Sequence, residues 1–398
     1  MATPPARGAQ IRVLCLDSGG VKVLSSLYIL ERLLYRIKPE DDPRQRIKPC
    51  DAFDIIVGSG MGGLLAIMLG VLEMDIQTCI ECFTSLAQDV YTPRRRTRVG
   101  GALIHKLLGS TRYSTKRFQQ LIRTMVRENH PDIQHLQRVK ESSDASESQT
   151  KEDATQTNIQ VTEPEDLPML ESKRRCKVFV CTMLENRTPY RIRSYRSKYE
   201  PGLPMTVWEA ARATTATPGH FEPLNFKNMT TMHDGSFRNA NPVLEVMSEI
   251  EHEFGLRDID ISCIVSIGAG VPKTTLLQDG LVDMAMACVD IASDAQATEA
   301  LFRSTYATPG KPLHERYFRF EVEQGLQDVR ADQWKKMRNM WSVTTAYLNH
   351  PLRQESLGKC AALLASDLPV GEALKGSWST LCNGYCGSVP EGVESLGP

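Results

Sequence analysis

The glycine-rich turn between a predicted strand and a predicted helix is the feature of this sequence with the clearest chemical meaning. Residues 53–63 read Phe-Asp-Ile-Ile-Val-Gly-Ser-Gly-Met-Gly-Gly. An apolar strand, a Gly-x-Ser-x-Gly turn and a helix together form a nucleophile elbow, which holds a serine hydroxyl above the end of a parallel sheet. Gly58 and Gly62 stand where the two flanking glycines belong, but Gly60 stands where the serine belongs. Because glycine has no side chain to act as a nucleophile, the sequence predicts the backbone of a serine hydrolase without its reactive group.

Three further segments accompany this turn. They read Val13-Leu-Cys-Leu-Asp-Ser-Gly-Gly-Val-Lys22, Ala210-Ala-Arg-Ala-Thr-Thr-Ala-Thr-Pro-Gly-His-Phe221 and Asp234-Gly-Ser-Phe-Arg-Asn-Ala-Asn-Pro242. In this order they resemble the oxyanion loop, the Ala-Ala-Arg-Ala-Thr segment and the Asp-Gly turn of patatin-like phospholipases. The glycine-rich turn itself resembles the Gly-Thr-Ser-Thr-Gly-Gly elbow of that family. Since these motifs are collinear and extend with weaker similarities over residues 11 to about 350, the chain is identified as a degenerate member that lacks the nucleophile serine.

The resemblance implies what the site residues would do. Members of this family are lipid acyl hydrolases with a Ser–Asp dyad and no histidine, and Asp234 matches the dyad aspartate. Gly19 and Gly20 match glycines of the oxyanion loop, whose backbone N–H groups would favour an anion. Ser18 replaces the first glycine of this loop, and Lys22 stands where the family has arginine. Lysine keeps the charge but lacks the bidentate fork of arginine, so the oxyanion loop is expected to be eroded.

Four side chains near these motifs are candidate ligand-binding residues: Ser18, Lys22, Ser59 and His233. Ser59 is offset by one residue from the nucleophile position, so we expect a packed turn serine that points away from the cleft. Ser18 is expected to project toward the cavity, as a structural or binding residue rather than a nucleophile. His233 precedes Asp234 on a strand and should face the other way. The alternative for His233 is a His/Asp pair that acts on water.

Composition limits the class of protein. The 398 residues are 41% hydrophobic and 24% charged, with a formal net charge of −1, so we expect a globular protein that does not bind nucleic acid. No apolar run reaches the ~18 to 20 residues of a transmembrane segment, and the polar N-terminus does not resemble a secretory signal. Eleven scattered cysteines favour free thiols in a reducing cytosol. Because Cys79 and Cys82 lack a second pair of ligands, neither a metal nor a cofactor is expected.

The order of predicted elements gives the fold class. A strand at 12–17, a helix at 23–35, a strand from 53 and a helix at 64–72 indicate a parallel sheet that is covered on both faces. With the resemblance, this predicts a three-layer α/β/α patatin-like fold with a mainly parallel central sheet. We expect a flexible N-terminus at 1–10, one domain over 11–350 and a C-terminal helix with a loose tail at 351–398.

Two segments of the predicted domain have an expected character of their own. Residues 140–172 contain hardly any apolar residues, so they predict a disordered insertion within the fold. Residues 275–365 are expected to form helices that are interrupted near residues 308–310.

Three functional hypotheses follow from these features. The first is a catalytically dead or impaired homologue that retains its cleft to bind an acyl lipid or to regulate. The second is a working acyl hydrolase or acyltransferase in which Asp234 activates water or an acceptor directly. The third is an interaction protein whose cleft is filled by its own side chains.

The ligand and the location of the protein are also expectations. The ligand implied by the resemblance is a glycerophospholipid, an acylglycerol or an acyl ester of a secondary metabolite. We expect a cytoplasmic protein with peripheral contact to membranes or lipid droplets. The basic run at residues 94–98 is read as a solvated loop, with contact to anionic headgroups as the alternative.

Overall fold

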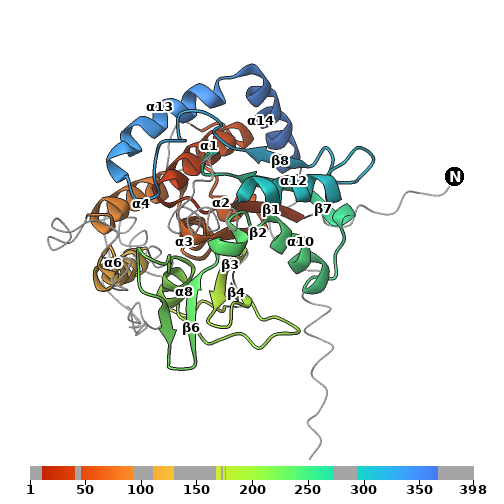
Figure 1. Ribbon diagram of the computed structural model, residues 1–398. Coiled ribbons are helices and arrows are strands. Elements are labelled where there is room, and N and C mark those ends of the chain that lie inside the picture. Colours follow the sequence, from red (N-terminus) through yellow and green to blue (C-terminus); the bar gives the residue numbers. More distant parts are fainter. Residues whose placement is uncertain are drawn as a thin grey trace, which may run out of the picture.

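A mixed β-sheet forms the centre of the protein, with helices on both of its faces (Figure 1). The computed structural model describes residues 11–40, 46–92, 111–129, 167–171, 174, 176–271 and 294–365. Its strands are β1 (Ile11–Leu16), β2 (Ile55–Ser59), β3 (Lys177–Leu184), β4 (Pro189–Arg193), β5 (Leu224–Phe226), β6 (Thr230–Asp234), β7 (Ile261–Ile267) and β8 (Tyr317–Phe320). The strand order is β5-β6-β3-β2-β1-β7-β8, and β4 pairs with β3. Because β3, β2, β1, β7 and β8 run parallel, the predicted α/β/α fold with a mainly parallel sheet is confirmed.

The helices are distributed along the chain between and after these strands. They are α1 (Val23–Ile37), α2 (Pro49–Ala52), α3 (Gly60–Ala66), α4 (Ile76–Val90), α6 (Thr115–Glu128), α8 (Val207–Thr214), α9 (Ser236–Asn239), α10 (Val243–His252), α12 (Ala295–Tyr306), α13 (Met337–Leu348) and α14 (Pro351–Leu364). A π-helical turn, Ile67–Val71, continues α3. Among these helices, none is both long and apolar enough to cross a membrane.

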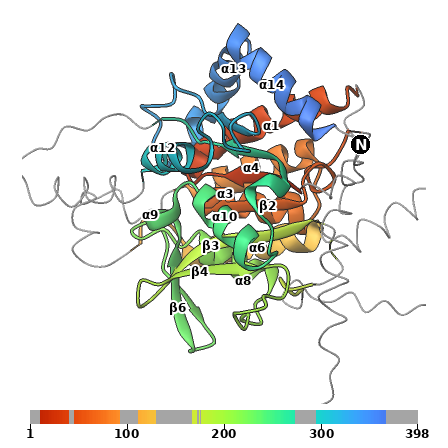
Figure 2. The same cartoon turned by 90° about the vertical axis from the view of Figure 1, so that its right-hand side faces the viewer.

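Side chains alternate along the strands and so divide the apolar interior into two cores. In β1, Leu14 and Leu16 face the larger core, whereas Val13 and Cys15 face the smaller one. Residues of α1, α3, α4, α8, α13 and α14 belong to the larger core, and α10 and α12 cover the smaller one. Figure 2 shows α13 and α14 stacked with α1 on the side opposite to β6. Burial on both faces explains why β1, β2 and β7 read as nearly continuous apolar runs.

The first helix shows how local sequence sets an element. α1 begins at Val23, as predicted, and ends at Ile37 rather than Tyr35. Leu27, Leu30 and Leu34, three and four residues apart, are buried on one face of the helix. Because this face is apolar, α1 packs against the sheet, where it lies beside α13 and α14.

Two expectations about the second half of the chain are corrected. Residues 275–365 are not helical throughout, because β8 lies within them and pairs in parallel with β7. The predicted insertion at 140–172 ends before Leu167, since Leu167 and Met169 are buried and the N–H of Met169 donates to the carbonyl of Met205 at 2.9 Å.

Several other predictions fall on residues outside the described ranges. These are the flexible N-terminus at 1–10, the basic run at 94–98, the insertion as far as residue 166 and the tail after residue 365. The domain boundary at 350 stays a prediction, and α14, which follows it, has Leu357 and Cys360 fully buried.

Candidate active site

The predicted elbow is present at the junction of β2 and α3. β2 ends at Ser59 and α3 begins at Gly60, whose φ of +56° lies in the left-handed region. Glycine adopts this region without strain, whereas another residue pays about 1 to 3 kcal/mol there. The helix also approaches β1 closely, because a Cβ on Gly62 would overlap the carbonyls of Leu16 and Asp17. The turn therefore keeps the backbone of a nucleophile elbow although its side chain is absent.

Strand register brings Gly60 and Asp234 together. Ser59 of β2 pairs with Cys181 of β3, and Asp234 of β6 pairs with the next residue, Thr182. β4 pairs with the opposite edge of β3. β2 and β6 therefore share one edge of β3, and the end of β2 lies next to the end of β6. An ideal Cβ built on Gly60 lies 3.3 Å from Oδ1 of Asp234. A serine at position 60 would thus place its hydroxyl within hydrogen-bond reach of the carboxylate.

Asp234 is held in a fixed orientation at the end of β6. Its side chain is buried, with 1% exposure of the residue. The hydroxyl of Thr217 donates to Oδ2 at 2.5 Å, and the N–H of Ser236 donates to Oδ1 at 2.8 Å. Burial raises the pKa of Asp234, and these hydrogen bonds oppose the rise because they stabilise the carboxylate. The aspartate is thus positioned as a dyad base would be.

Ser18 fills the space beside this aspartate. The ideal Cβ of residue 60 overlaps Oγ of Ser18 and lies 3.2 Å from its Cβ. The hydroxyl of Ser18 therefore lies where the nucleophile's own carbon would be. A side chain at position 60 therefore requires the hydroxyl of Ser18 to rotate out of this space and the two Cβ atoms to move apart by a few tenths of an ångström.

The oxyanion loop is fastened on both sides. The N–H of Ser18 donates to the carbonyl of Ala240 at 2.9 Å, and the N–H of Val21 donates to the carbonyl of Ala331 at 2.8 Å. Gly20 has a φ of +61°, and a Cβ there would overlap Ala331. A Cβ on Gly19 would likewise overlap Ala269. Both glycines are thus required by their surroundings, and their backbone N–H groups lie next to Ser18.

Lys22, Ser59 and His233 differ in their access to the site. Lys22 is partly buried, and burial lowers its pKa, although the nearby carboxylate of Glu321 opposes the shift. Ser59 is completely buried, and its hydroxyl has no hydrogen-bond partner among the described residues. Gly60 and Asp234 are buried as well, so burial does not separate Ser59 from the site, and its place among the candidate binding residues stays a prediction. His233 precedes Asp234 on β6, so its side chain leaves the opposite face of the strand.

A buried charge network below the oxyanion loop was not found from the sequence. Oδ2 of Asp17 lies 2.6 Å from Nη2 of Arg319, which also lies 2.9 Å from Glu321. Nη1 of Arg319 donates to the hydroxyl of Ser266 at 2.8 Å. Burial raises the pKa of Asp17 to about 7, although Arg319 lowers it. Asp17 and Glu321 thus share the guanidinium of Arg319. Of these three residues, only Asp17 belongs to a motif that the sequence shows, because it directly precedes the glycine loop.

A second buried cation, Arg212 of α8, lies near Asp234. Its guanidinium lies 5.8 Å from the ring centre of Phe118 and 5.9 Å from that of Phe221. Nη2 donates to the carbonyl of Glu222, whereas Nε and Nη1 have no hydrogen-bond partner among the described residues. Burial lowers the pKa of Arg212 to about 10, and Glu222 and Asp234 oppose this shift. Arg212 remains charged at neutral pH and helps to keep Asp234 ionised.

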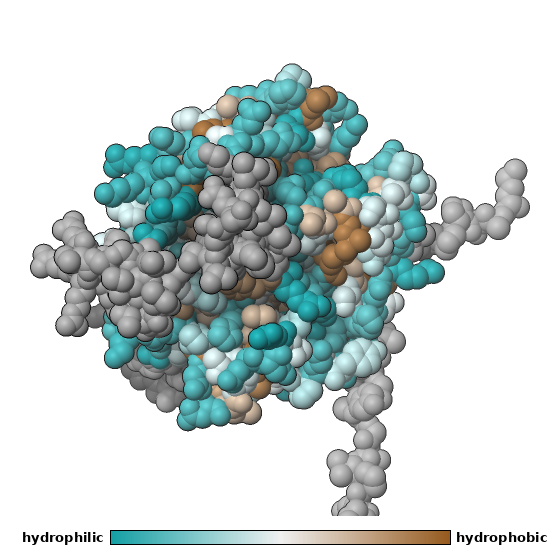
Figure 3. Space-filling view, in the orientation of Figure 1, coloured by the Kyte–Doolittle hydropathy of each residue, from teal (hydrophilic) through white to brown (hydrophobic). Residues whose placement is uncertain are grey.

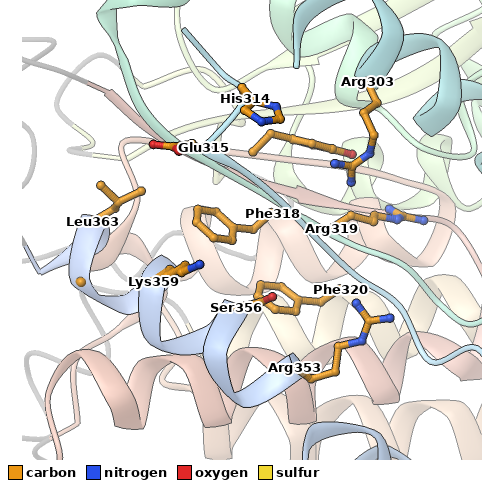
Figure 4. A pocket seen from close by; sticks show the side chains of 12 residues that line it. Arg303, His314, Glu315, Phe318, Arg319, Phe320, Arg353, Ser356, Lys359 and Leu363 are labelled. Carbon is orange, nitrogen blue, oxygen red and sulfur yellow. The ribbon is translucent and has the colours of Figure 1, made fainter. Parts of the chain in front are cut away.

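A surface groove of about 660 Å³ lies elsewhere, between β8 and α14 (Figure 4). Arg303, His314, Phe318, Arg353, Ser356 and Lys359 are among its lining residues. Neither Gly60 nor Asp234 lines it, so it is separate from the candidate site. On the face shown in Figure 3, the described surface is mostly hydrophilic, with apolar residues in small groups.

Comparison with known proteins shows which proteins this chain resembles. The sequence model of a family described as patatin-like phospholipase matches residues 14–247. Calcium-independent phospholipase A2-gamma of Homo sapiens is 27% identical over 280 residues, which cover 67% of this chain and 29% of that protein. Phospholipase A I of Arabidopsis thaliana is 22% identical over 348 residues, 81% of this chain and 25% of that protein.

A plant relative carries a name that bears on activity. Probable inactive patatin-like protein 9 of Arabidopsis thaliana is 22% identical over 276 residues, 66% of this chain and 61% of that protein. The chain therefore spans less than a third of the two phospholipases above and less than two thirds of this relative.

Proposed function

This chain belongs to the patatin-like phospholipase family, and from that premise we propose that it binds an acyl lipid beside Gly60 and Asp234 without the serine-based hydrolysis of its family. The observation that carries this proposal is the position of Ser18. Its hydroxyl occupies the space that the nucleophile's Cβ would need. Both the elbow, through Gly60, and the oxyanion loop, through Ser18, therefore differ from a site that holds a serine at position 60.

The polar groups of the site support retained binding. Asp234 keeps two hydrogen bonds that orient its carboxylate. The backbone of Gly19 and Gly20 is fixed by Ala269, which follows β7, and by Ala331 in the loop before α13. Oriented N–H groups bind the carbonyl oxygen of an ester whether or not a nucleophile is present. The ligand would be a glycerophospholipid, an acylglycerol or another acyl ester. Contact with membranes or lipid droplets and a cytoplasmic location stay predictions.

A second candidate function is slow acyl transfer through Ser18. Its hydroxyl and Oδ1 of Asp234 both lie near the ideal Cβ of residue 60. In this second function the hydroxyl would attack the carbonyl carbon of an ester and pass its proton to Asp234. That proton would then leave with the alcohol product, and water would hydrolyse the acyl-Ser18 bond. Against this, the N–H of Ser18 already donates to Ala240, so it is not available to the oxyanion.

One experiment separates the two candidates. The purified protein is treated with a fluorophosphonate probe and, separately, with a photoreactive acyl lipid, and modified peptides are identified by mass spectrometry. We expect no fluorophosphonate adduct, and photo-crosslinks within residues 18–22, 59–62 or 234–241. A stoichiometric adduct on Ser18 would establish the second function instead. Crosslinks confined to the groove between β8 and α14 would contradict both.

A further inference from the structure

We propose that Arg112 and Arg330, held by Asp332, bind the phosphate of the lipid whose acyl ester lies beside Gly60 and Asp234. This assignment rests on the proposed function, because it names the headgroup of the same ligand. It predicts a preference for lipids with a phosphomonoester over otherwise identical neutral acylglycerols.

The three residues form a compact ion cluster. Nη1 of Arg112 lies 2.6 Å from Oδ2 of Asp332, and Nε of Arg330 lies 3.4 Å from Oδ1. The hydroxyl of Tyr113 donates to Oδ2 of Asp332 at 2.8 Å. Burial alone would raise the pKa of Asp332, but the hydrogen bond from Tyr113 and the two arginines outweigh it and lower the pKa. The carboxylate is thus ionised and fixes both guanidinium groups.

This cluster carries an excess of positive charge that faces solvent. The side chains of Arg112 and Arg330 are 42% and 66% exposed, whereas that of Asp332 is 4% exposed. Within the described part of the chain, neither arginine has a second carboxylate at ion-pair distance. Each guanidinium therefore keeps N–H groups for another acceptor, and two guanidinium groups are well suited to the oxygens of a phosphate.

The groove between β8 and α14 shows the opposite arrangement. Three of its cations each have their own carboxylate: Arg303 with Glu299 at 2.8 Å, Arg353 with Glu323 at 2.5 Å and Lys359 with Glu355 at 2.7 Å. The positive charges of that groove are therefore balanced, although it contains more basic residues. Charge balance, rather than the number of arginines, distinguishes the Asp332 cluster.

One side of the cluster is joined to the oxyanion loop. Asp332 directly follows Ala331, whose carbonyl accepts the N–H of Val21. Val21 is the residue after Gly20, against which Ala331 packs. The cluster thus lies at the outer end of the loop that would hold the ester carbonyl.

The other side is joined to the aspartate. The N–H of Arg112 donates to the carbonyl of Gly219 at 3.0 Å, in the turn that begins at Thr217. His220 in this turn donates its N–H to the carbonyl of Thr217 at 3.0 Å, and the hydroxyl of Thr217 donates to Asp234. The oxyanion loop and Asp234 are therefore both connected to the Arg112–Asp332–Arg330 cluster. A single lipid needs this arrangement if its ester lies at the first two and its phosphate at the cluster.

The test compares two lipids that differ only in phosphate. Binding is measured with nonionic detergent micelles that carry either dioleoyl phosphatidic acid or dioleoylglycerol. We expect the unaltered protein to bind phosphatidic acid more tightly than dioleoylglycerol. In R112Q/R330Q the ratio of the two affinities should fall about tenfold, because losing charged hydrogen bonds costs about 1.5 kcal/mol. The control R303Q/R353Q removes two arginines of the balanced groove and should leave the preference unchanged. Since R112Q/R330Q leaves Asp332 without a counter-charge, R112Q/R330Q/D332N is measured beside it.

Each alternative result has a defined meaning. An unchanged preference in both variants would overturn the headgroup assignment while leaving acyl-lipid binding intact. Failure of the unaltered protein to bind either lipid would overturn the proposed function and this inference with it. Inorganic phosphate that binds with the same affinity as phosphatidic acid, and competes with it, would assign the cluster to a soluble phosphate ester instead of a lipid.

Discussion

Ser18 and Gly60 are sterically complementary: the hydroxyl of the first lies where the Cβ of a larger residue at the second would lie. The two positions belong to different motifs, separated by α1 and β2, and meet only because β1 and β2 pair in parallel. A change at one position therefore alters what the other can accommodate.

Restoring the nucleophile should require both positions. We expect Gly60→Ser alone to give no ester hydrolysis and a lower Tm, because the new side chain meets Ser18 and carries a strain of about 1 to 3 kcal/mol. Ser18→Gly/Gly60→Ser should hydrolyse a short-chain ester measurably, and adding Asp234→Asn should abolish that activity. Activity in Gly60→Ser equal to that of the double variant would show that Ser18 does not obstruct the site.

The stability of the protein should depend on pH through Asp17. Its pKa is raised to about 7 by burial, from an ordinary value of 3.8. Protonated Asp17 therefore contributes to the free energy of unfolding, and this contribution is complete below pH 4. It is lost as the pH rises through 7, by at most about 1.4 kcal/mol per pH unit. We expect Asp17→Asn to reduce this fall in Tm between pH 5 and pH 8. Asp89→Asn, at an exposed ion pair with Arg117, should retain it.

Glu249 should be the most sensitive carboxylate outside the site. It is fully buried and accepts hydrogen bonds from Arg191, Arg193 and Tyr195 at 2.9, 2.6 and 2.5 Å. Glu249→Gln leaves the two arginines without their shared charge and should destabilise by about 3 kcal/mol in urea unfolding. Glu245→Gln is the matched control, because Glu245 is partly exposed and pairs with Arg191 alone among the described residues. Equal losses in the two variants would refute this ranking.

The oxyanion loop should not tolerate a side chain at Gly20. Gly20→Ala introduces a left-handed alanine and an overlap with the backbone of Ala331. Gly310 has a φ of +88° and nothing within 4 Å of its ideal Cβ, so Gly310→Ala isolates the backbone strain. We expect the first variant to lower Tm clearly more than the second and to weaken lipid binding. Similar Tm values would mean that the loop adapts at little cost.

The fold was predictable because its signals are local and repeated. Continuous apolar runs identified β1, β2 and β7, and the elbow was recognisable from three glycines around position 60. β8 was missed because it has only four residues and lies in a stretch of turns between α12 and α13. Its pairing with β7 depends on tertiary contact rather than on local sequence.

The site was only half predictable for a similar reason. The proximity of Gly60 to Asp234 follows from motif order, but the position of the Ser18 hydroxyl depends on how two turns pack. Asp332 gave no signal, because its partners Arg112 and Tyr113 are more than two hundred residues away in the sequence.

The pairing of β7 with β1 has a consequence for work with fragments of this protein. The family match ends at residue 247, before β7, yet β7 lies between β1 and the edge strand β8 and pairs with both. A fragment that stops at the end of the match would expose the whole apolar edge of β1, and such an edge is a template for association between chains. It would also lack Ala331 and Arg319, which fasten the oxyanion loop and Asp17. Recombinant fragments for ligand studies should therefore extend through α14.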